Sequence, residues 1–324
     1  MKIAILDDYQ QAVRTLDCFK LLDGHEVTVF NDTVTDIDTL VSRLADQDAL
    51  VLIRERTTLS GELLARLPKL KLISQTGKIS NHINLKDCTR HNIAFAEGKG
   101  SPIAPSELCW TLIMAASRQL IPYATRLSEG QWQQSGSNGL GRTLHGLTLG
   151  IWGYGKIGQR IAQYGKAFSM NVLVWGSEPS RLQAQEDGFH SATTKTAFFQ
   201  STDIVSMHLR LNAATRHCVK LTDLQQMKTN ALFVNISRAE LVEEKALLTA
   251  LTTGSPGFAA LDVYEQEPAN LENQPLLNME NVLCSPHIGY VEQNSYELYF
   301  RIAFENVNAF FQGEPDNIAN PEVL

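Results

Sequence analysis

The chain alternates short apolar segments with segments of helix length, and it does so in two separate runs along its 324 residues. Strands that are separated by helices pair in parallel, because each crossover returns the chain to the same end of the sheet. The first run holds expected strands at 2–6, 26–30, 49–53 and 70–77, with helices at 35–47 and 60–67. The second run holds expected strands at 147–152, 171–176, 203–209, 231–237, 257–263 and 281–287. Each run therefore predicts a parallel α/β sheet.

Between the two runs lies a long helical pattern, residues 105–127, that opens with Pro, Ser and Glu. These residue types suit a helix start, and Pro122 is expected to kink the helix because proline lacks the N–H of the helical ladder. Residues 128–142 are rich in glycine and serine and predict a loop. Residues 295–313 predict an amphipathic helix near the chain end.

The composition excludes several classes of protein. Hydrophobic residues make up 44% and charged residues 19% of the chain, as in a globular protein of two domains. A net charge of -7 argues against a nucleic-acid face and against a basic membrane patch. We expect no membrane span, since no apolar run approaches about 18 residues. The N-terminal apolar run is too short for a signal peptide, and the five cysteines lack C-x-x-C spacing, so we expect a reduced cytoplasmic protein without a metal site.

Residues 150–158 read GIWGYGKIG, a glycine pattern between an expected strand and an expected helix. Gly153 suits a tight turn, Gly155 a close approach of backbone to a pyrophosphate, and Gly158 the packing of helix on strand. The helix start then offers free N–H groups to phosphate. A turn without a ligand is the alternative, but the flanking elements favour a dinucleotide. The expected contacts in this loop are Gly153, Tyr154, Gly155, Lys156, Ile157 and Gly158.

The acidic residue that ordinarily follows such a loop is missing. It is expected about 20 positions on, where it binds the adenosine ribose and repels a 2′-phosphate. Here the position is Gly176, 18 residues after Gly158. Ser177 and Arg181 suit a 2′-phosphate, whereas Glu178 suits the ribose of NAD. We therefore expect NAD or NADP as the cofactor, with weak discrimination between them.

Three later strands are each followed by one charged or titratable residue: Arg238, Glu267 and His287. Taken singly, these are ordinarily a solvated arginine, a loop carboxylate and a structural histidine. All three follow strands of one parallel sheet, however, and ligands bind beyond the carboxyl ends of such strands. We therefore expect the three side chains to converge on one crevice.

Six stretches of the chain carry a resemblance to a known family, in the family's order. They are IRERTTLS (53–60), LHGLTLGIWGYGKIGQRIA (144–162), DIVSMHLRL (203–211), MKTNALFVNISRAELVEEKALLTAL (227–251), AALDVYEQEP (259–268) and CSPHIGY (284–290). The chain resembles the D-isomer-specific 2-hydroxyacid dehydrogenases, which include phosphoglycerate dehydrogenases and glyoxylate or hydroxypyruvate reductases. The similarity runs almost from end to end.

The resemblance implies a fold of two doubly wound parallel-sheet domains. Residues 1–101 and 288–324 are then a flavodoxin-like substrate domain, and a Rossmann NAD(P)-binding domain, 102–287, is inserted into it. Catalysis is expected in the cleft between the domains, and a homodimer is expected through the nucleotide domain. The chain ends 37 residues after His287, so we expect no added C-terminal regulatory domain of the kind that longer members carry.

The chemistry assigns roles to the three strand-end residues. Reduction of a 2-keto acid needs a hydride from the cofactor and a proton for the developing alkoxide. His287 is the expected proton donor, Glu267 the carboxylate that favours its charged form, and Arg238 the fork that holds the substrate carboxylate and carbonyl. The resemblance adds further expected cofactor contacts: Asp262 on the nicotinamide carboxamide, with a turn cap as the alternative, and, near the cofactor, His208 and Ile236.

The substrate loops depart from the family pattern. Expected substrate contacts are Arg54, Gly77, Lys78 and Ile79, together with Arg238 and His287. Glu55 stands where a hydroxyl is usual, Ile79 where a second glycine is usual, and Tyr290 replaces a glycine after His287; further departures are Ala239 for a glycine and Arg210 for a proline. Arg54, Arg56 and Lys78 suit a phosphate, so a phosphorylated acid such as 3-phosphoglycerate and an unphosphorylated one such as hydroxypyruvate or glyoxylate both remain open.

Two further functions are compatible with the same motifs. A dinucleotide-sensing binding protein, like the transcriptional corepressors of this fold, would bind cofactor but would not need a proton donor. A formate-type enzyme is the weaker alternative, because hydride transfer from formate needs no acid–base pair such as Glu267 and His287.

Overall fold

The computed structural model describes residues 1–80 and 82–324, which divide into two compact units. Unit 1 comprises Met1–Ser101 and Val291–Leu324, and unit 2 comprises Pro102–Tyr290. The sequence placed the second boundary at His287, whereas unit 2 extends to Tyr290. The reason lies in Asp262, whose carboxylate accepts hydrogen bonds from the backbone N–H groups of Ile288 and Gly289 and so holds this segment on unit 2.

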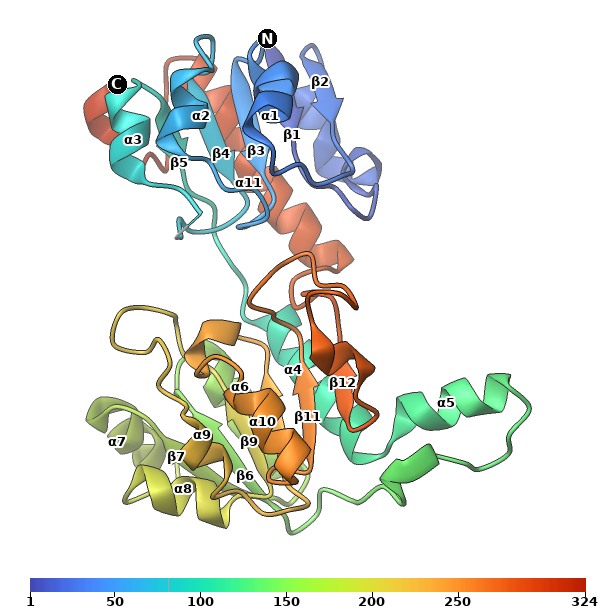
Figure 1. The fold of residues 1–324 in the computed structure, drawn as a ribbon. Helices are drawn as coiled ribbons and strands as arrows, with labels where there is room; N and C mark the ends of the chain where they lie inside the picture. Colours follow the sequence, from blue (N-terminus) through green and yellow to red (C-terminus); the bar gives the residue numbers. More distant parts are fainter. Residues whose placement is uncertain (81) are drawn as a thin grey trace. The chain divides into compact units, whose positions relative to one another are not determined.

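Unit 1 is built on a five-stranded parallel sheet with the strand order β2-β1-β3-β4-β5 (Figure 1). The strands are β1 (Lys2–Ile5), β2 (Glu26–Val29), β3 (Ala49–Leu52), β4 (Leu72–Gln75) and β5 (Ala94–Ala96). This is the flavodoxin-like order of a doubly wound sheet. The sequence missed β5, which is only three residues long and too short to produce a periodic pattern.

Helices cover both faces of this sheet. They are α1 (Ile37–Leu44), α2 (Gly61–Ala65), α3 (Leu85–Arg90) and α11 (Gln293–Phe311). The first three contribute to a core with one side of the strands, where Leu44, Leu50 and Phe95 are completely buried. The long helix α11 packs along β3 and β4 and buries Phe300 and Phe304. The amphipathic helix that the sequence predicted near the chain end thus completes the fold of the first hundred residues.

Unit 2 is built on a seven-stranded sheet with the order β12-β11-β10-β9-β6-β7-β8, again parallel throughout. The strands are β6 (Thr148–Trp152), β7 (Asn171–Trp175), β8 (His190–Ser191), β9 (Ile204–Met207), β10 (Leu232–Asn235), β11 (Phe258–Leu261) and β12 (Val282–Cys284). From β8 to β11 this is the Rossmann order, in which the strand order reverses between β6 and β9. The predicted fold class is confirmed in both units. The two-residue β8 was not predicted.

The sheet of unit 2 also has a core on each face. The helices are α4 (Ile103–Ser117), α5 (Leu120–Ser128), α6 (Lys156–Ala167), α7 (Glu178–Glu186), α8 (Lys195–Ser201), α9 (Leu221–Leu224) and α10 (Ala246–Thr253). Residues of α4, α6 and α7 form the core on one face, and residues of α8, α9 and α10 form the core on the other. Residues of α4 on this core include the completely buried Cys109 and Ile113.

The helical segment between the two runs breaks at a different place from the one predicted. We expected a kink at Pro122, but α4 ends at Ser117 and α5 begins at Leu120. Gln119 between them adopts a left-handed conformation with φ 53°. Pro122 falls in the first turn of α5, where a helix has no N–H bond to lose and proline is tolerated.

Among the described residues, no helix combines the length and the apolar character needed to cross a bilayer, and no three His, Cys, Asp or Glu side chains are grouped to hold a metal ion. All five cysteines are free thiols.

Candidate active site

The loop after β6 leaves an open space at the start of α6. Gly153 has φ 100°, and a Cβ there would lie 2.7 Å from the carbonyl oxygen of His208. A Cβ on Gly158 would lie 2.1 Å from the carbonyl oxygen of Gly153, so loop and helix are in contact at a point where no side chain fits. A Cβ on Gly155, by contrast, would meet nothing within 4 Å. Two glycines thus bring the backbone close together, and the third leaves room for a ligand.

The start of α6 supplies hydrogen-bond donors to that space. The fourth residue of the helix, Gln159, donates its N–H to the carbonyl oxygen of Gly155 at 2.9 Å. The N–H groups of Lys156, Ile157 and Gly158 precede it and have no acceptor within the helix. An open space beside three such donors fits the pyrophosphate of a dinucleotide.

Tyr154 is the exception among the six predicted loop contacts. Its side chain is buried, and its hydroxyl donates to Asp187 Oδ2 at 2.8 Å. Burial and the nearby Asp187 carboxylate raise the pKa of this hydroxyl above its usual range. Tyr154 can therefore serve a cofactor only through its backbone.

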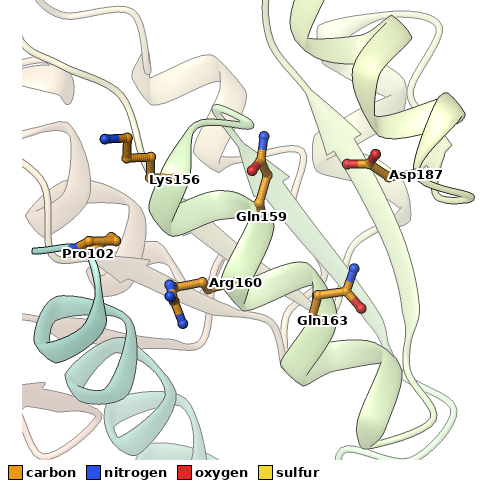
Figure 2. A pocket seen from close by; sticks show the side chains of 6 residues that line it. All are labelled: Pro102, Lys156, Gln159, Arg160, Gln163 and Asp187. Carbon is orange, nitrogen blue, oxygen red and sulfur yellow. The ribbon is translucent and has the colours of Figure 1, made fainter.

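A surface cavity of about 580 Å³ runs along α6 beside this loop. Figure 2 shows its lining: Pro102, Lys156, Gln159, Arg160, Gln163 and Asp187. Four of these residues belong to α6, and Lys156 is the helix's first residue. The cavity lies beside the open space at Gly155, and its lining lacks the histidine and carboxylate pair that acid–base chemistry would need.

The end of β7 lacks a carboxylate at the ribose position, as the sequence indicated. Gly176 has φ 155°, and Ser177 is the N-terminal cap residue of α7 with an exposed side chain. Glu178 is the first residue of that helix and is exposed. Arg181 stacks over the indole of Trp175, with its guanidinium carbon 5.1 Å from the ring centroid, which holds a permanent positive charge close to this strand end.

Glu267 and His287 meet beyond two neighbouring strands. Glu267 follows β11, His287 follows β12, and Arg238 follows the adjacent β10. His287 Nδ1 lies 2.7 Å from Glu267 Oε2, and the other carboxylate oxygen accepts the N–H of Tyr264 at 3.0 Å. The side chain of His287 is 26% exposed. With Nδ1 held by the carboxylate, Nε2 is the nitrogen that remains for a substrate.

The side chain of Glu267 is 36% exposed, and neighbouring charges keep its carboxylate ionised. Burial acts to raise the pKa of this carboxyl group, but the hydrogen bond and charge of His287 act against it. The N–H of Tyr264 and the positive charge of Arg238 act in the same direction, and together they hold the pKa of Glu267 below its usual value. The charges of His287 and Arg238 thus both act on Glu267, which follows the strand between theirs.

Asp262 fastens the loop that carries His287. Its buried carboxylate accepts from the N–H of Ile288 at 2.9 Å, the N–H of Gly289 at 2.9 Å and the hydroxyl of Ser285 at 2.6 Å. Burial raises the pKa of Asp262 even though these donors oppose the shift. The contacts are those of a turn cap, the alternative role for this residue, and its role toward a carboxamide stays a prediction. Sequence reasoning missed Ser285, because a serine near a histidine has no distinctive pattern.

His208 supports the glycine loop from the protein interior. The residue is half-buried with its Nδ1 enclosed, and Nε2 lies 2.8 Å from Ser206 Oγ, which in turn lies 3.3 Å from Cys109 Sγ. Burial lowers the pKa of His208 to about 3, so the imidazole is neutral at physiological pH. Its carbonyl oxygen lies against Gly153. Ile236, the other expected neighbour of the cofactor, packs against the core on the α4 side of the sheet.

The expected substrate loops of unit 1 are occupied by groups of the chain itself. Arg54 lies over Gly77 so closely that a Cβ on this glycine would come within 2.0 Å of Arg54 Nη1. The N–H of Ile79 donates to Glu97 Oε1 at 2.8 Å, and Lys78 Nζ lies 2.7 Å from Glu97 Oε2. Glu97 follows β5, the strand that the sequence did not predict, and it was missed for the same reason.

Comparison with known proteins identifies the family of this chain. Residues 110–289 match the family model described as the NAD-binding domain of the D-isomer specific 2-hydroxyacid dehydrogenases. The chain belongs to this family. A glyoxylate reductase of Aeropyrum pernix is 34% identical over 295 residues, which cover 89% of this chain and 87% of that protein. The protein is therefore an NAD-dependent oxidoreductase that acts on the CH–OH group of hydroxy acids.

Two solved structures of the family are similar in sequence as well as in fold. A structure from Ralstonia solanacearum, named as a candidate D-3-phosphoglycerate dehydrogenase, has a TM-score of 0.98 at 56% identity and covers 100% of this chain and 98% of its own. A phosphoglycerate oxidoreductase from Vibrio cholerae O395 has a TM-score of 0.95 at 59% identity and covers 97% of this chain and 99% of its own. The family and the fold that the sequence motifs indicated are thus confirmed.

Proposed function

We propose that this dehydrogenase interconverts a small D-2-hydroxy acid and its 2-keto acid, with His287 as the acid–base group. The observation that carries the proposal is the 2.7 Å contact between His287 Nδ1 and Glu267 Oε2. It leaves Nε2 for the substrate and places a carboxylate where it stabilises a charged imidazole. Arg238, on the adjacent strand end, adds the positive charge that an anionic substrate requires.

The proposed reaction assigns one task to each side chain. When bound, the nicotinamide cofactor supplies the hydride for C2 of the keto acid. His287 Nε2 gives its proton to the developing alkoxide, and Glu267 holds Nδ1–H so that the ring stays oriented. Arg238 binds the substrate carboxylate and polarises the carbonyl. In the oxidation direction, His287 accepts the proton from the hydroxyl group.

We propose NADP as an alternative cofactor beside NAD. The support is the absence of a carboxylate at Gly176 and the positive charge of Arg181 stacked on Trp175. Without the carboxylate, nothing at this position repels a 2′-phosphate. We expect kcat/KM for NADH and NADPH to differ by less than about a hundredfold.

The substrate is a small anionic acid of one of two kinds. The relative from Aeropyrum pernix is named for glyoxylate, and the two solved structures are named for phosphoglycerate. Arg54, Gly77, Lys78 and Ile79 form the proposed substrate loops of unit 1. A panel of 2-keto acids assayed with both reduced cofactors identifies the preferred one.

Replacement of His287 tests the proposed chemistry. We expect His287→Ala to reduce kcat by roughly 10² to 10⁴, the usual effect of removing a general acid. Cofactor affinity, measured by quenching of protein fluorescence, should change little, because the imidazole acts on the substrate. A variant that keeps more than about a tenth of wild-type activity at neutral pH contradicts the assignment. A wild-type protein that binds NADH but does not oxidise it with any 2-keto acid supports the corepressor-like alternative.

We also propose a homodimer formed through unit 2. Its support is a set of apolar side chains in and after α5 that are exposed in the single chain: Leu120, Ile121, Leu127, Trp132 and Leu140. Leu140 is 90% exposed, and a groove of about 490 Å³ beside α5 includes Ile121, Phe258 and Met279 in its lining. Exposed apolar patches of this kind mark interaction sites. Light scattering at micromolar concentration tests the dimer, and a monomeric mass contradicts it.

A cytoplasmic location is the remaining part of the proposal. Its support is the five free thiols, since oxidising compartments favour disulfides. Cell fractionation with an antibody to the protein tests it, and recovery from an extracytoplasmic fraction contradicts it.

A further inference from the structure

We infer that the loops of unit 1 select an unphosphorylated 2-keto acid and reject a phosphorylated one, and that Glu97 determines this choice. The inference rests on the proposed function, because it concerns the substrate class of that same site. The inferred substrate differs from phosphoglycerate, the compound in the names of the two similar solved structures.

The carboxylate of Glu97 occupies the two hydrogen-bond donors that a phosphate in this loop would need. One carboxylate oxygen accepts the N–H of Ile79 at 2.8 Å, and the other lies 2.7 Å from Lys78 Nζ. The side chain of Glu97 is only 19% exposed, whereas that of Lys78 is 65% exposed. The lysine is therefore the exposed partner of this ion pair, and the carboxylate is the enclosed one with two donors. A phosphate at Lys78 would have to displace this ion pair.

Hydrogen bonds hold the backbone of Glu97 at both its N–H and its carbonyl group. Its N–H donates to the carbonyl oxygen of Asn317 at 3.0 Å, and its own carbonyl oxygen accepts from Asn306 Nδ2 at 3.2 Å. The next residue, Gly98, donates its N–H to the carbonyl oxygen of Gly77 at 2.8 Å. The backbone of Glu97 is therefore held against the loop that carries Gly77 and Lys78.

Arg56 is engaged as well. Its Nη1 donates to the carbonyl oxygen of Asp7 at 2.6 Å, and its guanidinium carbon lies 4.4 Å from the ring centroid of Tyr9. The Asp7 side chain is buried and accepts from Thr33 Oγ1 at 2.8 Å and from the hydroxyl of Thr57. An arginine that is stacked on a ring and bonded to a backbone carbonyl serves the fold of this loop.

The charges of the loops balance one another and leave no positive surplus for a phosphoryl group. The positive residues are Arg54, Arg56, Lys78 and Lys99, and the carboxyl groups of the same loops are Asp7, Asp8, Glu55 and Glu97. Arg54 holds its guanidinium over Gly77, and one such fork suits one carboxylate. A phosphoryl group adds a charge of about -1.5 to -2 at neutral pH. Close to the enclosed carboxylate of Glu97, that charge is repelled.

The experiment compares two substrates that differ only in the phosphoryl group. Reduction of hydroxypyruvate and of 3-phosphohydroxypyruvate by the wild-type protein is followed as NADH oxidation at constant ionic strength. We expect kcat/KM to be at least about a hundredfold lower for the phosphorylated acid. A wild-type kcat/KM that is equal or higher for the phosphorylated acid overturns the inference.

Two variants test whether Glu97 causes the selection. Glu97→Gln keeps an oxygen for the N–H of Ile79 but removes the charge that neutralises Lys78. We expect it to raise the ratio of phosphorylated to unphosphorylated kcat/KM by at least about tenfold, and Lys78→Met added to it should abolish the gain. Glu314→Gln, the same charge change at an exposed residue outside the loops, is the matched control and should leave the ratio unchanged. An unchanged ratio in Glu97→Gln overturns the role of Glu97.

Binding distinguishes this inference from the proposed function. A protein that reduces no 2-keto acid contradicts the proposed function, and calorimetry with glycerate and 3-phosphoglycerate then decides the inference without turnover. Tighter binding of glycerate supports the inference. Equal or tighter binding of 3-phosphoglycerate overturns it.

Discussion

Two loops of this protein follow a parallel strand, contain glycine and face the expected position of an anion, yet they differ in what fills them. The loop after β6 has nothing within 4 Å of a Cβ position at Gly155. In the loop after β4, the Cβ position of Gly77 is taken by Arg54, and the N–H of Ile79 is taken by Glu97. One loop is open to a ligand, and the other is filled by the protein's own charges.

The difference arises from the next structural element after each loop. Beyond Gly155 the chain enters α6 at once, a helix of 12 residues whose first N–H groups have no acceptor of their own. Beyond Gly77 the next helix, α3, begins only at Leu85 and has six residues. The second loop therefore has no helix start that leaves donors open to an anion, and its donors at Lys78 and Ile79 are taken by the carboxylate of Glu97. A glycine loop in a sequence indicates a site only when its donors are not already used.

The largest expected effect comes from closing the open loop. Gly158→Ala places a Cβ 2.1 Å from the carbonyl oxygen of Gly153, where backbone and not a flexible side chain must move. We expect the dissociation constant for NADH to rise at least about a hundredfold, measured by fluorescence titration. Gly100→Ala is the control, since its Cβ would meet nothing within 4 Å. Equal affinity in both variants would show that the loop does not hold the cofactor.

The histidine behind the open loop should make unit 2 sensitive to acid. Burial lowers the pKa of His208 from 6.5 to about 3, so the unfolded chain binds a proton at a higher pH than the folded one. The stability from this group is complete above pH 6.5 and is lost as the pH falls toward 3. At pH 4.5 the loss should reach about 2 kcal/mol.

His208→Gln removes this titration and keeps a side chain that can hydrogen-bond to Ser206. Urea unfolding at pH 7 and pH 4.5 should therefore show a smaller loss of stability for the variant than for the wild type. Equal losses in the two proteins would mean that His208 does not titrate as its burial requires.

A smaller effect is expected from disturbing the filled loop. Gly77→Ala places a Cβ 2.0 Å from Arg54 Nη1, which is the end of a flexible side chain and can move away. We expect KM for the keto acid to rise about tenfold while the affinity for NADH stays unchanged. This is the reverse of the Gly158→Ala result. A loss of NADH affinity in Gly77→Ala would remove the distinction between the two loops.

The smallest effect concerns the far end of the dinucleotide. Arg181→Ala should lower kcat/KM for NADPH about threefold to tenfold more than for NADH, because only NADPH carries the 2′-phosphate. Glu186→Gln is the control: its side chain is exposed at the last position of α7, and it should not change the preference. A wild-type preference for NADH beyond about a hundredfold would show that another group replaces the missing acid.

Local patterns in the sequence determined the fold class, the glycine loop and the strand ends that carry Arg238, Glu267 and His287. These features depend on neighbouring residues, on the periodicity of strands and helices and on the spacing of three glycines, so they can be read along the chain. The break at Gln119 was placed wrongly at Pro122, because it uses a left-handed glutamine that no local pattern marks.

Only the tertiary structure decided how the strand-end residues are used. Glu97 reaches Lys78 across 19 positions of sequence, and Asp262 reaches Gly289 across 27. In a parallel sheet every neighbouring strand end belongs to a distant part of the chain, because a helix must return between strands. The sequence therefore shows which charges are present, but only the sheet order determines which of them neutralise one another and which are left for a ligand.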